Sequence, residues 1–311
     1  MLVNREEKMP STTFSNVPGM KATTAVPVLE VNQLSEATFS GTYVSNSRPL
    51  VIKGGVKHWA AIEKWRDKNY LKKRAGHHEI FLYPNEYHNS RKRMEAKGKR
   101  LMLLADAIDH LHAEETEIGI IITGKPTELL SDLGGVPYLS NMQPAFGYPP
   151  VRYFFFRNAG TTWHFHSFDE TLMCQIVGSK KIGLLNVNNP SGWIIRNIFL
   201  YEHYYDDPSA FDGFDNTGLQ WFEASLDPGD ALYIPPLWWH GVVPTTTSFG
   251  STASLTWRSP PHIIADSLKR MASGDADIMG KFDFVRPDEL RDVARKMGLE
   301  EELAIAWQRG I

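Results

Sequence analysis

Two histidines stand one residue apart in the stretch WHFHSFDE, which runs from Trp163 to Glu170. On a strand, alternate side chains share a face, so His164 and His166 would present two imidazoles to one point. Imidazole is the commonest nitrogen ligand for first-row metals. A third imidazole, His240, follows the stretch GDALYIPPLWW, whose strand could pair with that of His164. The pattern predicts a metal site built from two distant segments, although a His-x-His pair is also compatible with structural histidines.

The elements that must position these histidines are short strands. From Val151 onward the sequence gives apolar runs such as VRYFFFRN, TLMCQIVG, KKIGLLNV and TASLTW, bounded by Gly, Asn, Asp or Pro. Many short strands without long helices between them are typical of a sandwich or barrel. The chain before position 150 mixes helical and strand patterns, and the chain after position 260 is helical. We therefore expect a mainly β fold with flanking helices.

Three parts are expected along the chain. Residues 1–25 are rich in Ser, Thr, Pro and Gly, which predicts a flexible N-terminal leader. Residues 26–258 carry the strand-rich domain with its N-terminal α/β elements, and residues 259–311 form a C-terminal helical extension. Apolar residues at helical spacing in this extension need a partner surface. That surface is either the β domain of the same chain or a second copy, so a homodimer through these helices is one expectation.

Composition restricts the class of partner. The chain has 311 residues, 42% of them hydrophobic, which is enough to bury a large core. A formal net charge of -3 provides no overall positive field, which argues against nucleic acid, and no apolar run is long enough for a membrane span. The single cysteine, Cys174, lies in the apolar run TLMCQIV and is expected to be a small buried hydrophobe. This composition, without a signal-peptide pattern, predicts a cytoplasmic protein.

The stretches GTTWHFH, TLMCQIVGSKKIGLL, DPGDALYIPPLWWHGV and TASLTW together resemble the JmjC branch of the cupin superfamily, oxygenases that use iron(II) and 2-oxoglutarate. The resemblance is specific from about Val151 to Trp257 and extends more loosely back to RPLVIKGGVKHWAAIEKW. It implies a double-stranded β-helix, or jelly roll, as the core. It also implies a strand-borne His-x-Asp/Glu pair and a distal histidine as metal ligands, which gives these roles to His164 and His240.

The sequence departs from this family motif at His166, which stands where the carboxylate should be. Three interpretations follow. His166 itself is a ligand in a three-histidine site, or Asp169 bends back to supply the carboxylate, or His166 does not bind and leaves a position for water, halide or substrate. A neutral imidazole in place of a carboxylate leaves the ferrous complex one charge unit more positive.

The resemblance also implies a 2-oxoglutarate site. Lys180 in GSKKIGLL matches the lysine that binds the distal carboxylate, whereas its neighbour Lys181 should face the other side of the strand. Thr161 matches a hydroxyl that assists this lysine. A lysine inside a barrel is costly unless it meets an anion, which favours the functional interpretation of Lys180. Leu255 stands where relatives carry a polar residue, so this wall of the pocket is expected to be drier.

The function implied is that of an iron(II)- and 2-oxoglutarate-dependent oxygenase. It would consume dioxygen, release succinate and carbon dioxide, and hydroxylate a small molecule or a peptide side chain. The long insertion NNPSGWIIRNIFLYEHYYDDPSAFDGFDNTG supplies Tyr201, Tyr204 and Tyr205 as expected substrate contacts, together with Trp239. Two alternatives stay open: a three-histidine cupin dioxygenase that acts without 2-oxoglutarate, and a catalytically silent JmjC-like binding module.

Overall fold

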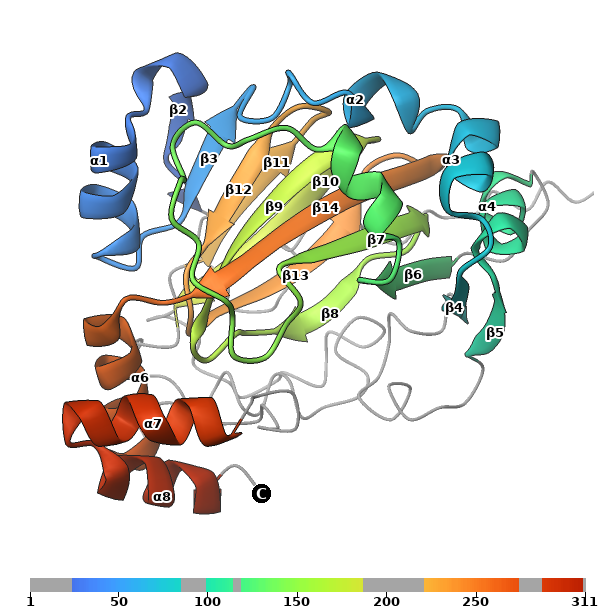
Figure 1. Cartoon of the computed structure of the whole chain (residues 1–311). Coiled ribbons are helices and arrows are strands. Elements are labelled where there is room, and N and C mark those ends of the chain that lie inside the picture. Colours follow the sequence, from blue (N-terminus) through green and yellow to red (C-terminus); the bar gives the residue numbers. More distant parts are fainter. Residues whose placement is uncertain (1–23, 85–98, 114–118, 187–220, 274–286, 310–311) are drawn as a thin grey trace, which may run out of the picture.

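The computed structural model describes residues 24–84, 99–113, 119–186, 221–273 and 287–309, and its strands form two sheets that face each other (Figure 1). Of the predicted leader, residues 1–25, only Thr24 and Ala25 are described. They form strand β1, which pairs in parallel with β11 at the edge of the smaller sheet. The expected jelly-roll core with flanking helices is confirmed.

The smaller sheet carries the strands that hold the distal histidine and the lysine pair. Its five described strands follow the order β1 (Thr24–Ala25), β11 (Trp221–Leu226), β10 (Lys180–Asn186), β13 (Trp238–Pro244) and β8 (Thr161–His164). All pairs except β1 with β11 are antiparallel. Strands β10, β13 and β8 therefore lie side by side, which brings residues of three separate segments onto one inner face.

The larger sheet supplies the opposite wall. Its nine described strands follow the order β2 (Val28–Glu30), β3 (Leu50–Lys53), β12 (Ala231–Ile234), β9 (Asp169–Val177), β14 (Phe249–Arg258), β7 (Val151–Arg157), β6 (Gly119–Thr123), β4 (Glu79–Pro84) and β5 (Arg100–Leu103). The helices of the N-terminal half are α1 (Glu36–Thr38), a π-helix (Phe39–Val44), α2 (Ala61–Lys64), α3 (Lys68–Ala75) and α4 (Leu104–His112), with 3-10 turns at Val31–Gln33 and Thr127–Asp132.

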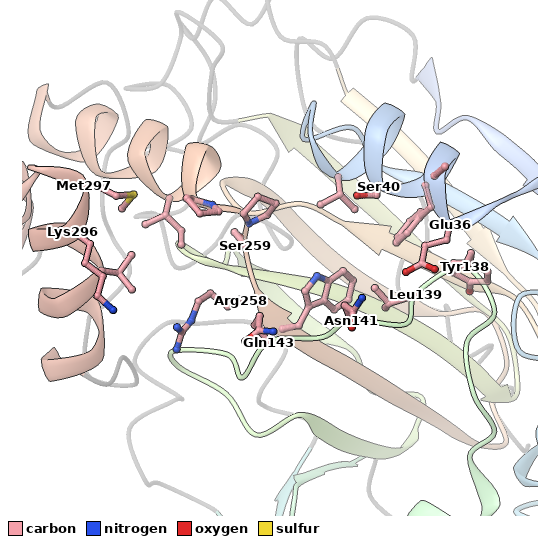
Figure 2. Close-up of a pocket in the computed structure, with 18 residues that line it drawn as sticks. Glu36, Ser40, Tyr138, Leu139, Asn141, Gln143, Arg258, Ser259, Lys296 and Met297 are labelled. Carbon is pink, nitrogen blue, oxygen red and sulfur yellow. The ribbon is translucent and has the colours of Figure 1, made fainter.

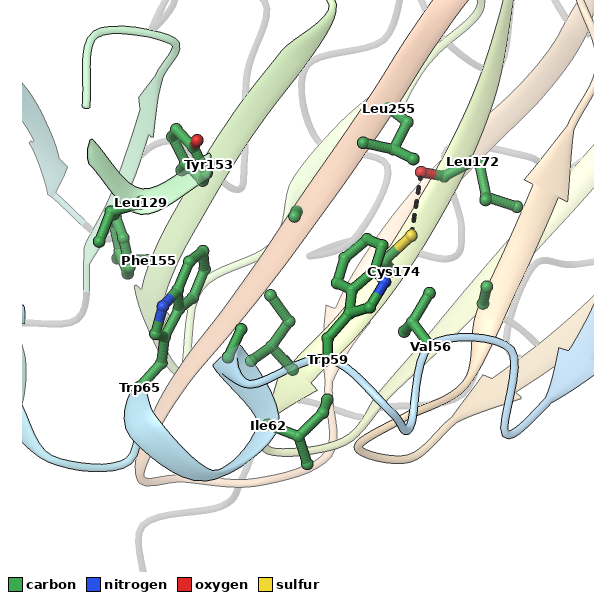
Figure 3. Close-up of a cluster of buried hydrophobic side chains, with 14 of the residues drawn as sticks. Val56, Trp59, Ile62, Trp65, Leu129, Tyr153, Phe155, Leu172, Cys174 and Leu255 are labelled. Carbon is green, nitrogen blue, oxygen red and sulfur yellow. Dashed lines mark hydrogen bonds between the residues drawn. The ribbon is translucent and has the colours of Figure 1, made fainter. Parts of the chain in front are cut away.

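A hydrophobic core covers the outer face of the larger sheet (Figure 3). The indoles of Trp59 and Trp65 are buried against side chains of β9 and β7 such as Cys174 and Phe155. Cys174 is fully buried, its thiol points to the Leu172 carbonyl oxygen, and burial raises its pKa. This confirms the expectation of a buried hydrophobe. Removing either indole would lower the free energy of unfolding by about 3–5 kcal/mol. This core therefore stabilises the larger sheet on its outer face.

The prediction that Leu255 dries the pocket wall is wrong. Leu255 belongs to the outer core, because it is Thr252, three positions earlier on β14, that accepts a hydrogen bond from Lys180 of the opposite sheet. Alternation then places Ser254 and Thr256 on the inner face with Thr252. The inner wall of β14 is therefore polar, and the apolar position lies one residue away from where the sequence resemblance suggested.

Three described helices follow strand β14: α6 (Pro261–Ser273), α7 (Pro287–Met297) and α8 (Glu300–Arg309). They pack on one another, with α6 against both α7 and α8 (Figure 1). Whether they also join two copies of the chain stays a prediction. None of the described helices is both long enough and apolar enough to cross a membrane.

Candidate metal centre

The three histidines predicted as metal ligands meet inside the jelly roll. Strand β8 ends at His164, which lies directly opposite His240 on β13. His166 follows just beyond the end of β8, and its carbonyl oxygen accepts a hydrogen bond of 2.8 Å from the Leu237 N–H. One ring nitrogen of each histidine lies within 4.8 Å of those of the other two. Two distant segments thus bring three imidazoles to a common point.

Hydrogen bonds at the outer ring nitrogens orient two of these imidazoles. His240 Nδ1 donates to the Trp238 carbonyl oxygen at 2.9 Å, which leaves the Nε2 lone pair for a metal. His166 Nδ1 lies 2.6 Å from Thr171 Oγ1, and its Nε2 is buried without a hydrogen bond in the described part of the chain. A buried ring nitrogen without a partner is unfavourable unless a ligand meets it. The orphaned Nε2 of His166 therefore fits a metal ligand.

Two of the histidines, His166 and His240, are held in the neutral form that binds metals. Burial lowers the pKa of His166 and of His240 well below 6.5. A neighbouring imidazole is the next cause, His240 in the case of His166 and His164 in the case of His240. Imidazole nitrogens suit a divalent first-row ion such as iron(II). They would add no negative charge to it.

A β-bulge places Thr161 on the same inner face as His164. On β13, His240 and Val242 are two residues apart, but their partners on β8, His164 and Thr161, are three apart. The extra residue in β8 reverses the usual alternation, so both side chains face inward. Gly160 permits this close approach, since a Cβ there would lie 1.7 Å from the Val242 carbonyl oxygen. Thr161 Oγ1 is buried and makes no hydrogen bond to any described residue.

Asp169 lies at the start of β9, and both of its carboxylate oxygens are engaged by backbone. They accept hydrogen bonds from the N–H groups of Phe146 at 2.7 Å and Gly147 at 2.9 Å. Burial is the largest influence on its pKa and raises it, against these two hydrogen bonds. Among the described residues, the group of ligand atoms around His240 consists of the three histidines without this carboxylate. Asp169 in this position anchors the segment that precedes β7.

Lys180 reaches across the jelly roll from the smaller to the larger sheet. Its Nζ donates a hydrogen bond of 2.7 Å to Thr252 Oγ1 on β14 and lies 4.4 Å from the centre of the Phe156 ring. Burial lowers its pKa to about 7, and no charged group of the described chain offsets this effect. Lys181 faces the other side of β10, where it forms an ion pair of 3.1 Å with Glu223. The ammonium group of Lys180 thus lies in the interior without an anion from the described part of the chain.

Comparison with protein families decides the class of this site. The model of the cupin-like domain matches residues 36–261, which is most of the chain. The chain belongs to the cupin-like, JmjC family. This family typically uses iron(II) and 2-oxoglutarate, and the members that use them are oxygenases. The three histidines between the sheets, with Lys180 on the neighbouring strand β10, are therefore a possible metal site of the kind that this family uses.

Relatives of this cupin-like chain have names that specify different target residues. Lysine-specific demethylase 8 of Xenopus tropicalis is 26% identical over 252 residues, which are 78% of this chain and 54% of the relative. Jumonji C domain-containing protein 5 of Drosophila melanogaster is 24% identical over 75% of this chain and 59% of its own length. Arginine-specific demethylase JMJ22 of Arabidopsis thaliana is 24% identical over 80% and 51%. The chain thus spans little more than half the length of these relatives, and their names do not agree on one substrate.

The predicted substrate contacts of this cupin-like domain are only partly described. Tyr201, Tyr204 and Tyr205 lie outside the described residues. Trp239 is buried and packs edge-on against Phe165, with ring centres 4.7 Å apart. Because it neighbours His240 on β13, its side chain lies on the opposite face of that strand from the metal site. A contact between Trp239 and substrate stays a prediction.

Two residues near the histidines, Tyr148 and Arg152, were not predicted from the sequence. The Tyr148 ring centre lies 4.9 Å from that of His166, and the guanidinium carbon of Arg152 lies 3.9 Å from the Tyr148 ring centre. Arg152 belongs to β7, whose sequence VRYFFFR is otherwise apolar between its arginines. A charge at an inward position of such a strand is the signal that could have identified it.

The cavity seen in Figure 2 lies elsewhere in the cupin-like chain. Its volume is about 560 Å³, and its lining combines the end of β14 with α1, the π-helix and helices α6 and α7. Glu36, Tyr138, Arg258 and Lys296 are among the lining side chains (Figure 2), and none of the three histidines is. This cavity is therefore separate from the possible metal site.

A second histidine group lies on the surface. His77 Nε2 and His78 Nε2 lie 3.3 Å and 2.9 Å from the two carboxylate oxygens of Glu128. These ligand atoms also lie within 4.8 Å of one another. The His77 side chain is 66% exposed, so this group faces solvent.

Proposed function

We propose that this chain is an iron(II)- and 2-oxoglutarate-dependent oxygenase that hydroxylates a small molecule or a peptide side chain. The observation that carries the proposal is the buried ammonium of Lys180, which meets no anion among the described residues and lies in the same interior as the three histidines. When bound, the iron and 2-oxoglutarate would supply the activation of dioxygen, with conversion of the oxo acid to succinate and carbon dioxide.

His164, His166 and His240 would hold the metal. The orphaned Nε2 of His166 supports its role as the third ligand, and the two backbone hydrogen bonds of Asp169 argue against a carboxylate ligand at that position. The protein would then contribute no negative charge to the metal. Such a site would accept an additional anionic ligand more readily than one with a carboxylate.

Lys180 and Thr161 would bind the distal carboxylate of 2-oxoglutarate. The ammonium and the unpaired hydroxyl are both buried, so each gains a charge-assisted hydrogen bond when the dianion enters. Apolar side chains around the strands, including Ile182, Leu184 and Val242, exclude water from this interior. The two residues would thereby orient the oxo acid toward the histidines.

The decisive experiment titrates the full chain anaerobically with iron(II) and then with 2-oxoglutarate, and calorimetry measures the affinity for each. Succinate formation is then measured after air is admitted. Lys180→Met should lower the affinity for 2-oxoglutarate by about 10–100-fold, since it removes a charge-assisted hydrogen bond. Lys181→Met is the matched control, because the next residue of β10 carries the same group on the outer face. Equal affinity in both variants would contradict the proposal.

The three-histidine arrangement also favours a second candidate, a dioxygenase that binds its substrate directly to the metal without 2-oxoglutarate. Iron-dependent oxygen consumption that continues without 2-oxoglutarate would select this candidate. A chain that takes up no stoichiometric iron under anaerobic conditions would instead be a silent binding module.

A further inference from the structure

Arg152 is an inward-facing cation that the proposed chemistry leaves without a role. On β7 it shares a face with Phe154 and Phe156, and Phe156 lies beneath the ammonium of Lys180. Its cross-strand neighbour on β14 is Ser254, two residues from Thr252 and on the same inner face. Arg152 therefore faces the interior that contains Lys180 and the histidines.

Stacking fixes the position of this guanidinium beside the metal site. Arg152 lies 3.9 Å from the centre of the Tyr148 ring, and the Tyr148 ring centre lies 4.9 Å from that of His166. The Tyr148 ring thus lies close to both the guanidinium and a candidate metal ligand. Its positive charge also contributes to the lowered pKa of His166 and His240.

Arg152 has no hydrogen-bond acceptor among the residues that the structure describes. Its Nε is buried without a hydrogen bond, and the guanidinium forms no ion pair within the described ranges. The nearby carboxylate of Asp169 already accepts two backbone N–H groups. A planar guanidinium held in this way offers two parallel donors, which match the two oxygens of a carboxylate.

We propose that Arg152 receives a carboxylate of the molecule that is oxidised, so that the substrate is an acid. This inference rests on the proposed oxygenase function and adds the substrate class. Lys180 is assigned to 2-oxoglutarate, and the candidate metal ligands are three histidines without a carboxylate. Among the described residues near Arg152, the carboxylate of Asp169 is already engaged by two backbone N–H groups. A cationic side chain, such as the names of two relatives specify, would be repelled by the guanidinium.

The test compares butyrate, hexanoate and benzoate with their primary amides. Dissociation constants are measured by ligand-observed NMR on the full chain, both unloaded and loaded anaerobically with iron(II) and 2-oxoglutarate. In the loaded protein each acid should bind at least about tenfold more tightly than its amide. Arg152→Gln should reduce this ratio to about one, whereas Arg152→Lys should restore most of it.

Arg258→Gln is the matched control. Arg258 also stacks on a ring, 4.1 Å from the centre of Phe146, but it already forms an ion pair of 2.7 Å with Glu289. This variant should keep the preference for acids. Melting temperatures and iron affinity of all variants report whether the fold is intact.

Several outcomes would overturn the inference. Acids and amides that bind the wild type equally, or an unchanged preference in Arg152→Gln, would do so. A loss of 2-oxoglutarate affinity in Arg152→Gln as large as that in Lys180→Met would assign Arg152 to the co-substrate instead. Failure to bind iron and 2-oxoglutarate would contradict the oxygenase function alone, because the acid preference is also measured in the unloaded protein.

Discussion

The chain gathers histidines in two regions, one inside the jelly roll and one on the surface, and the two differ in what their ring nitrogens already bind. In the surface group, both imidazoles lie at hydrogen-bonding or ion-pairing distance from Glu128. In the interior group, His166 is 3% exposed, and its Nε2 has no partner in the described chain. Short distances between ligand atoms occur in both regions. Burial without a partner among the described residues, rather than proximity, therefore distinguishes the candidate metal site.

The largest expected difference is in iron affinity. His240→Ala removes a ligand and should weaken anaerobic iron(II) binding by more than about 100-fold, since even outer partners of ligands are worth 10–100-fold. The double variant His77→Ala/His78→Ala should leave this affinity unchanged. Calorimetry and elemental analysis measure both. Iron lost equally from the two proteins would remove the distinction between the regions.

Asp169 sharpens the comparison, because it is a buried carboxylate near the interior group. Asp169→Asn should destabilise the fold by about 1–3 kcal/mol, since the N–H groups of Phe146 and Gly147 lose a charged acceptor. Iron affinity should stay within about twofold of the wild type. Glu128→Gln on the surface should cost less than about 1 kcal/mol. Urea unfolding reports both, and a large loss of iron in Asp169→Asn would instead make it a ligand.

The two lysines of β10 extend the comparison to pH. Because burial lowers the pKa of Lys180 to about 7, the fraction that carries a charge falls tenfold per pH unit above that value. The affinity of the iron-loaded protein for 2-oxoglutarate should therefore fall by up to about tenfold per unit between pH 7.5 and 9.5. Calorimetry over this range measures the slope. Lys180→Met should flatten it, whereas Lys181→Met should leave it unchanged.

Acid stability gives the smallest expected difference. The pKa values of His166 and His240 lie below 6.5 in the folded chain, so below pH 6.5 the unfolded state binds protons that the folded state does not. Stability should therefore fall with pH from 6.5 downward, by up to about 1.4 kcal/mol per unit for each histidine. His166→Gln should lower this slope in the unloaded protein, and His77→Gln should not. Denaturant unfolding at pH 5.0, 5.5 and 6.5 measures it.

Local rules were sufficient for much of the site. Alternation predicts that Lys180 and Lys181 face opposite sides, and the structure has them so. The jelly roll that unites His164 with His240 came from the resemblance of several stretches to one family, since periodicity alone gives strands but not their pairing. The family model confirms that resemblance.

The rest depended on features that a sequence does not encode locally. The bulge that turns Thr161 inward exists only through the pairing of β8 with β13, and strict alternation would have placed Thr161 opposite to His164. Leu255 was misplaced by one residue, which on a strand means the wrong face. The proximity of Arg152 to the histidines depends on the long-range packing of Tyr148 against His166, which the local sequence does not predict.

The irregularity in β8 also limits how this segment can vary. Four residues there present two inward side chains at a spacing that regular pleating cannot give. Substitutions between Thr161 and His164 preserve that arrangement. Deletion of a single residue there would instead turn the side chain of either Thr161 or His164 away from the interior. Natural variants and engineered libraries should consequently accept substitutions in this stretch while rejecting any change in its length.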